Sequence, residues 1–235
     1  MRIIDLSLMI DPEKQYTGFP RDKVYNKPAY KTVITPVGTI KGNGVFSCKL
    51  EMYTQEFTHY DAPAHYIEGG LLNHEVPLDH LVGEGVVIDM MYKKENEGVS
   101  VGDLERSGVE VKRGDIAIIR TGWTDRAWGT WEFWKNMIYL TTDAADWLIE
   151  KGIKALVQDF MTCDPPLNPP PERRWPSPDW APNHKKFLGK GICLIEFCTN
   201  LGAIKEPRVL LICAPIKLKG TDGAPCRVMA IEGLL

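Results

Sequence analysis

Apolar residues recur along the chain in short runs of strand length, separated by turns and by a few helix-like segments. The clearest run is Ile116-Ala117-Ile118-Ile119, which follows a Gly-Asp turn and predicts a central strand over residues 116–120. A second compact run, over residues 85–91, is bounded by glycines and lysines, as in a strand buried on both faces. Further strands are expected over residues 2–8, 32–37, 44–58, 153–159, 192–196, 209–214 and 227–231.

Three short helices are expected between these strands. Ser100 and Asp103 form a capping-box pattern that begins the first helix, and Gly108 closes it. Thr142 is placed to cap the second. The second and third helices are expected over residues 143–151 and 183–190, and a proline-rich loop, long enough to act as a lid, over residues 165–182. Strands that recur with few helices predict a mixed α/β class with a partly antiparallel sheet.

Composition narrows the class of protein. The 235 residues are 44% hydrophobic and 25% charged, so we expect a single compact domain over residues 1–235 with a sizeable core. A net charge of -3 with scattered basic residues argues against nucleic acid as a partner. No apolar run is long enough for a membrane span, and the start has no signal-peptide pattern. The six cysteines include no C-x-x-C pair and fit a reducing, cytoplasmic location.

The densest group of chemically active residues lies between Gln55 and His65. If the strand that begins near residue 44 continues through Asp61, its period-2 alternation puts Gln55, His59 and Asp61 on one face. An imidazole and a carboxylate two residues apart on one face can converge on a metal ion. A hydrogen-bonded strand end is the alternative reading. Pro63 then begins a helix that brings His65 back over the strand end.

A second pair of candidates lies far along the chain. His184 is followed twelve positions later by Glu196, which ends an apolar strand where an unpaired charge is costly. A buried salt bridge or a metal ion would compensate that carboxylate equally well. The other two of the five histidines, His74 and His80, lie in a polar segment and are expected at the surface.

These residues resemble a known family. Thr58-His59-Tyr60-Asp61-Ala62-Pro63-Ala64-His65 is similar to the H-x-G-T-H-x-D-x-P-x-H signature of the cyclase-like metal-dependent hydrolases, which include bacterial kynurenine formamidase and isatin hydrolase. Four further segments match in order: Asp5-Leu6-Ser7, Arg120-Thr121-Gly122-Trp123, the pair His184 and Glu196, and residues 217–227, similar to a closing P-L-K-x-x-G-x-D-G-S-P-x-R segment.

The resemblance implies a swivelling β/β/α fold and hydrolysis of an amide, formyl amide or cyclic amide of a small molecule by metal-activated water. It implies that His59, Asp61, His184 and Glu196 ligate the metal and that His65 is the general acid and base. Glu196 could also orient the reacting groups. Phe19, in a segment similar to the family's W/Y-P-G-D loop, becomes a candidate aromatic wall for the substrate. A homodimer or larger homo-oligomer is also implied.

Two departures from the signature change the expectation. Gln55 stands where the signature has its first His, and Phe57 stands where it has Gly. A Gln carbonyl oxygen is a harder and weaker ligand than imidazole, which shifts the preference from zinc toward manganese or magnesium. We therefore expect one divalent ion, manganese or zinc, with Gln55 as a ligand, and the change argues against a second metal.

Two other functions compete with this hypothesis. A cysteine hydrolase would use Cys198 or Cys163 with His184, although Cys198 lies close to an apolar strand and lacks an obvious activating setting. A catalytically degenerate member of the family would bind a small molecule or act as a scaffold, as the missing first His suggests. Metal content discriminates the last case, because a degenerate protein would purify without metal.

Overall fold

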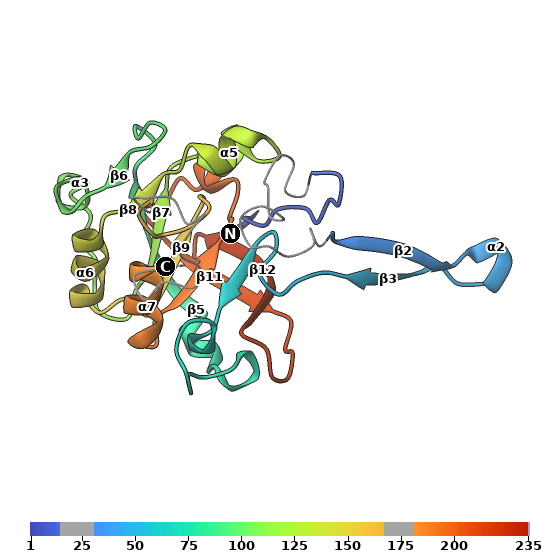
Figure 1. The fold of residues 1–235 in the computed structure, drawn as a ribbon. Coiled ribbons are helices and arrows are strands. Elements are labelled where there is room, and N and C mark those ends of the chain that lie inside the picture. The colour runs from blue at the N-terminus through green and yellow to red at the C-terminus, as the bar shows by residue number, and fades with distance from the viewer. Residues whose placement is uncertain (15–30, 167–180, 235) are drawn as a thin grey trace.

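The computed structural model describes residues 1–14, 31–166 and 181–234, and in these ranges eight strands form one mixed sheet (Figure 1). The strands are, in spatial order, β1 (Arg2–Asp5), β12 (Gly223–Glu232), β11 (Arg208–Pro215), β5 (Val82–Asp89), β7 (Ile116–Arg120), β9 (Ala155–Gln158), β10 (Cys193–Glu196) and β4 (His59–Asp61). β5, β7, β9 and β10 run parallel to one another. The short β4 pairs antiparallel with both β10 and β12 and so closes the sheet into a ring.

Two hydrophobic cores lie on opposite faces of the parallel strands. Ile116 and Ile118 join a core with residues of β11 and β12, whereas Ala117 and Ile119 join a core beneath the helices. Successive side chains of a strand point to opposite faces, so a strand covered on both sides must be apolar throughout. The predicted central strand over residues 116–120 is therefore confirmed, and its burial on both faces explains its unbroken apolar sequence.

Helices cover the outer face of the sheet. The larger ones are α3 (Val101–Arg106), α6 (Thr142–Lys151) and α7 (Pro182–Gly189); shorter segments are α4 (Trp123–Ala127), α5 (Trp131–Lys135), η1 (Pro63–His65), η2 (Asn73–Glu75), η3 (Leu78–His80) and η5 (Leu201–Ala203). The Ser100–Asp103 capping box is present. α6 begins one residue earlier than predicted, with Thr141 rather than Thr142 at the N-cap, and Gly152 ends it in the left-handed conformation.

A second, two-stranded sheet projects from this body. β2 (Val33–Gly38) pairs with β3 (Ser47–Glu51), and α2 (Ile40–Asn43) lies at the far end (Figure 1). We call residues 31–51 the arm. A small parallel pair, β6 (Gly98–Val99) with β8 (Tyr139–Leu140), lies beside the main sheet.

These elements make one α/β domain with a mixed sheet, as predicted for the fold class. Its closed ring of strands is the feature that positions the site, while the swivelling β/β/α description remains a prediction. Within the described ranges, no helix combines the length and apolar character that a bilayer crossing requires.

Candidate metal centre

β4 brings His59 and Asp61 into the interior. Both side chains are almost completely buried. Because β4 lies antiparallel to β10, Glu196 is the register partner of His59, although 137 positions separate them. His59 Nε2 lies 3.5 Å from Asp61 Oδ1 and 3.7 Å from Glu196 Oε2. Strand pairing thus assembles three donor groups from two distant segments.

His184 completes the cluster from the first half of α7. Its Nε2 lies 3.4 Å from Asp61 Oδ2 and 3.4 Å from Glu196 Oε1. Each carboxylate therefore presents one oxygen to His59 and the other to His184. His59, Asp61, His184 and Glu196 are called the metal cluster below.

The metal cluster has the properties of a cation site. All four side chains are buried, and neither oxygen of Asp61 has a hydrogen-bond partner among the described residues. An ionised carboxylate without a hydrogen bond is costly in a protein interior, and a bound cation removes that cost. His59, Asp61 and Glu196 each offer one ligand atom within 4.8 Å of the others. The residues present fit a divalent metal with mixed nitrogen and oxygen ligands.

The hydrogen bonds behind the imidazoles leave their Nε2 atoms for a metal. His59 Nδ1 lies 2.8 Å from the carbonyl oxygen of Phe57, which can only accept, so the ring must carry its proton there. His184 Nδ1 donates to the carboxylate of Asp164. Partners of this kind set the tautomer and orientation of metal-ligating histidines.

The two carboxylates of the metal cluster differ in electrostatic setting. Burial alone raises the pKa of Asp61, but His65, His184 and His59 around it outweigh burial and lower that pKa. For Glu196, burial dominates and raises its pKa despite His184. Glu196 Oε1 also accepts a hydrogen bond from Gln158 Nε2 at 3.0 Å. A bound cation would favour the ionised form of both groups.

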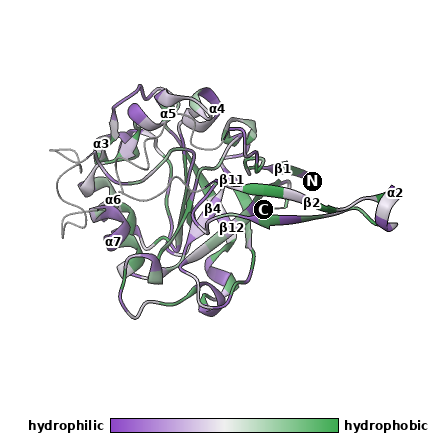
Figure 2. Cartoon of the chain, turned by 45° about the vertical axis from the view of Figure 1, so that its right-hand side comes forward, coloured by the Kyte–Doolittle hydropathy of each residue, from purple (hydrophilic) through white to green (hydrophobic). Residues whose placement is uncertain are grey.

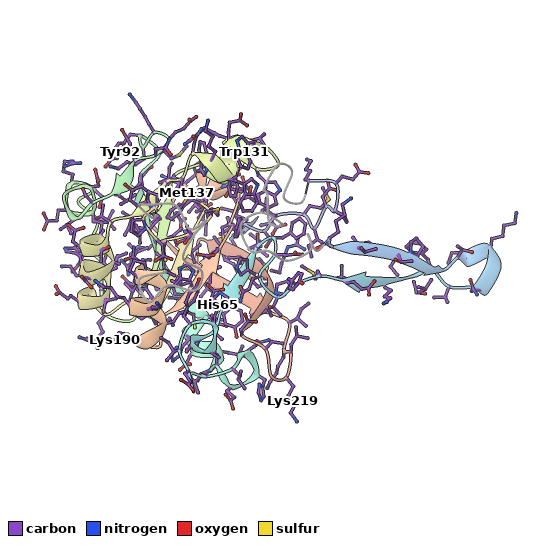
Figure 3. All side chains as sticks on the ribbon, in the orientation of Figure 1. His65, Tyr92, Trp131, Met137, Lys190 and Lys219 are labelled. Carbon is purple, nitrogen blue, oxygen red and sulfur yellow. The ribbon has the colours of Figure 1, made fainter. Side chains whose placement is uncertain are left out.

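His65 lies in the segment directly after β4, on the 3₁₀ turn that Pro63 begins (Figure 3). Its Nδ1 donates to Asp222 Oδ2 at 2.8 Å, and its ring centroid lies 6.3 Å from that of His184. Burial lowers the pKa of His65, but the Asp61 charge and the Asp222 hydrogen bond prevail and raise it. His65 thus lies beside the metal cluster, with its Nδ1 held by Asp222.

Gln55 lies next to His65 and Asp222, but the backbone conformation that places it there differs from the predicted strand. The continuous strand expected through Asp61 is wrong, because β3 ends at Glu51 and residues 54–58 form turns and bends. Phe57 lies within them at φ 54°, a left-handed conformation that is uncommon for a bulky residue and easy for the glycine of the family signature. The alternation argument for Gln55 therefore fails. Its Nε2 donates to Asp222 Oδ2 at 3.2 Å and lies 3.3 Å from His65 Nδ1.

Three residues that support the site were missed. Asp164 holds His184, Gln158 holds Glu196, and Asp222 accepts hydrogen bonds from His65, Gln55 and Thr54. These three hydrogen bonds outweigh burial and lower the pKa of Asp222. The sequence did offer a reason to consider Asp222, because this residue lies beside Gly223 in the closing segment that resembles the family. Asp164 and Gln158 carry no comparable local signal.

Other candidates fall outside the metal cluster. Cys163 Sγ lies 3.5 Å from His184 Nδ1, but burial raises the pKa of the thiol to about 12, so it is not an activated nucleophile. Burial also raises the pKa of Cys198. His74 and His80 are half-buried and contact Gly220 and Gly191 rather than the cluster. Phe19 lies outside the described residues, as does most of the predicted 165–182 lid.

Comparison with models of protein families identifies the family of the chain. A family model described as "Putative cyclase" matches residues 4–165, more than half of the chain. The chain belongs to the cyclase family. The matched range contains His59, Asp61 and His65, whereas His184, Glu196 and Asp222 lie beyond it. The resemblance to cyclase-like metal-dependent hydrolases is thereby confirmed.

Curated relatives include known enzymes. The chain is 26% identical over 193 residues to "Kynurenine formamidase" of Erythrobacter litoralis, covering 82% of this chain and 80% of the relative. It is 26% identical over 212 residues to "Cyclase-like protein 1" of Arabidopsis thaliana, covering 86% of this chain and 76% of the relative. The kynurenine formamidase relatives indicate a hydrolase.

Solved structures share the fold over nearly the whole chain. One is titled a potential metal-dependent hydrolase with cyclase activity, with a TM-score of 0.71, 26% identity, and coverage of 97% of this chain and 96% of that one. Another is an isatin hydrolase bound to the product analogue thioisatinate, with a TM-score of 0.81 at 20% identity, covering 97% of this chain and 91% of that one. At 20% identity, the second match supports the fold alone.

Proposed function

We propose that this protein is a metal-dependent hydrolase that cleaves a C–N bond of a small amide, formyl amide or cyclic amide. The observation that carries the proposal is the buried carboxylate of Asp61, which has no hydrogen-bond partner within the described ranges and lies between the Nε2 sides of His59 and His184. Similarity to the kynurenine formamidase of Erythrobacter litoralis supports the choice of this bond type.

The proposed ligands are His59, Asp61, His184 and Glu196, with Gln55 as an additional oxygen ligand. Gln55 Nε2 donates to Asp222, and the amide of a Gln also carries an oxygen acceptor, the type of atom that ligates a hard cation. Two or three oxygen donors beside two imidazoles suit one manganese or zinc ion. When bound, the metal would supply Lewis-acid chemistry, polarising a carbonyl and lowering the pKa of water.

His65 is the proposed general acid and base. Its Nδ1 donates to Asp222, so its Nε2 can accept a proton from the attacking water and return it to the leaving nitrogen. Asp222 fixes the tautomer and stabilises the imidazolium that forms between the two transfers. Gln55 and Thr54 hold Asp222 in turn. Glu196, held by Gln158, orients the cluster from the opposite side.

The proposal also covers cellular location, oligomeric state and the substrate wall. All six cysteines are free in the structure, which supports a reducing, cytoplasmic location. We expect a homo-oligomer, and Phe19 stays a candidate for the substrate wall.

The decisive experiment combines metal analysis with an activity screen. Freshly purified protein is analysed for bound metals, stripped, reloaded with manganese or zinc, and assayed on formyl-anilide, cyclic imide and lactam substrates. We expect one metal per chain and metal-dependent hydrolysis. Metal-free protein that neither takes up metal nor hydrolyses any substrate would instead identify a degenerate, small-molecule-binding member of the family.

A further inference from the structure

Cys163 is a buried thiol beside the metal cluster. Its Sγ lies 3.5 Å from His184 Nδ1, and its side chain is completely buried. Cys163, His184 and Glu196 each offer one ligand atom, and these three atoms lie within 4.8 Å of one another. The ligands implied by the family resemblance are nitrogen and oxygen donors alone. Cys163 therefore adds a sulfur donor that the proposed function does not use.

The backbone around this thiol is fixed to the helix that carries His184. Asn183, the residue before His184, donates from its side-chain amide to the carbonyl oxygen of Cys163 at 2.8 Å. In return, Asp164 Oδ1 accepts from the backbone N–H of Asn183 at 2.6 Å. α7 itself contacts both α6 and β10 (Figures 1 and 2). These contacts hold the thiol and the imidazole next to each other.

Buried polar atoms without partners lie next to the same residues. Both oxygens of Asp61 and the Oε1 of Gln158 are buried and accept no hydrogen bond from the part of the chain that the structure describes. Asp61 Oδ2 faces His184 Nε2, and Gln158 Nε2 donates to Glu196. Buried acceptors of this kind cost free energy until a donor or a cation reaches them. They are independent evidence that a cation completes this region.

A sulfur donor changes which ions such a site prefers. Thiolate suits zinc and softer ions, whereas manganese and magnesium prefer carboxylate and carbonyl oxygens. Zinc is most often four-coordinate, with a zinc–sulfur distance of about 2.3 Å. A thiol within reach of two residues of the metal cluster should therefore engage zinc or cadmium and leave manganese to the nitrogen and oxygen donors.

We propose that Cys163 is a further metal ligand, which joins His184 and Glu196 around a zinc or cadmium ion but not around manganese. The inference rests on the proposed function, because it requires that the cluster bind a metal. Since His184 and Glu196 belong to both ligand sets, each chain still holds one ion. Binding replaces the S–H bond of Cys163 by a sulfur–metal bond, and the proton passes to the solvent. His184 Nδ1 stays with Asp164, so a rotation of Cys163 about its Cα–Cβ bond brings the sulfur to the ion.

Cobalt(II) is the probe for this ligand, because it replaces zinc in four-coordinate sites and shows a sulfur-to-cobalt charge-transfer band only when a thiolate is bound. All proteins carry Cys48→Ser, which removes the exposed cysteine. This parent, loaded with one cobalt ion per chain, should show the band in the near ultraviolet. Cys163→Ser should bind cobalt more weakly and lose the band at saturating cobalt.

Cys193→Ser is the matched control. Cys193 is as completely buried as Cys163, but it lies on the face of β10 opposite Glu196. The control therefore loses an equally buried thiol without touching the proposed ligands, and it should keep the band. Far-UV circular dichroism establishes that each variant is folded.

Competitive metal binding gives a second readout. Cys163→Ser should weaken zinc and cadmium binding at least about tenfold, because the loss of even a supporting partner costs about 10–100-fold. Manganese binding should not change. Equal weakening of zinc and manganese binding would show a structural role for Cys163 and overturn the inference.

The outcomes also separate this inference from the proposed function. Cobalt that binds the parent without a charge-transfer band, a band that Cys163→Ser keeps, or a band lost equally in Cys163→Ser and Cys193→Ser would overturn the inference alone. A parent that takes up no divalent metal would overturn both. If Cys163→Ser does not fold, X-ray absorption of the zinc-loaded parent decides: one sulfur at about 2.3 Å is expected, and a shell of nitrogen and oxygen alone would contradict it.

Discussion

The histidines of the site occupy two contrasting settings. The side chains of His59 and His184 are 3% and 6% exposed, and their Nε2 atoms face buried carboxylates. His65 is 24% exposed, and its partner Asp222 is 38% exposed. A buried imidazole between carboxylates suits a cation, whereas a half-open imidazole can exchange protons with water. In the proposed function, burial rather than residue type distinguishes the two histidines proposed as ligands from the one proposed to carry the proton.

The largest effect is expected from removal of a buried ligand. His59→Ala and Asp61→Ala should each weaken metal binding by more than about a hundredfold, because the loss of even a supporting partner costs about 10–100-fold. Hydrolysis should fall below detection, while circular dichroism shows a folded protein. Metal analysis of both purified variants checks this. Stoichiometric metal in both would remove these residues from the site.

His65→Ala should separate the two settings. The variant should retain its metal, since His65 lies on the more exposed side, but turnover should fall by about 10²–10⁴-fold. Metal content and kcat measured on the same preparation check this expectation. Loss of metal together with activity would make His65 a ligand and abolish the contrast.

Asp222→Asn should change the pH dependence of kcat/KM. In the wild type, burial lowers the pKa of His65 while Asp61 and Asp222 raise it. A bound cation would offset the Asp61 charge, so the Asp222 contribution is the one to test. Without the negative charge of Asp222, the pKa of His65 should fall. The base form then persists to lower pH, and the acidic limb of the kcat/KM profile should move to lower pH, with a loss of about tenfold or less at neutral pH. An unmoved limb would show that another group titrates there.

Gln55→His should have the smallest effect, on metal preference. If Gln55 Oε1 ligates, imidazole in its place should raise affinity for zinc relative to manganese, because nitrogen ligands suit zinc better than a carbonyl oxygen does. Competitive metal binding of wild type and variant, measured side by side, checks this. An unchanged preference would assign Gln55 to Asp222 and His65 alone.

The parallel half of the fold was largely predictable, because its strands are buried on both faces and show continuous apolar runs such as Ile116–Ile119. The side chains of His59, Asp61, His184 and Glu196 lie close together, and their role as metal ligands stays a prediction. The position of Gln55 relative to His59 could not be predicted from strand alternation, because Phe57 between them adopts a left-handed conformation in a turn. Asp164 was missed because its contact with His184 spans 20 positions and leaves no local pattern. Asp222 lies in the family-like closing segment, but its pairing with His65 across 157 positions could not be predicted from that segment.

The pairing of the three-residue strand β4 also determines at what point during synthesis the site can assemble. Its register partners are Leu194–Glu196 and Gly223–Pro225, which the ribosome adds more than 130 residues after His59. Contacts of such long range form late, since the chain must first close a large loop. During synthesis, His59 and Asp61 emerge early but have no anchored neighbours until almost the whole chain has left the ribosome. Any metal that the cluster binds would therefore be captured after synthesis of these segments, and a chain truncated before residue 223 would lack the pairing of β4 with β12.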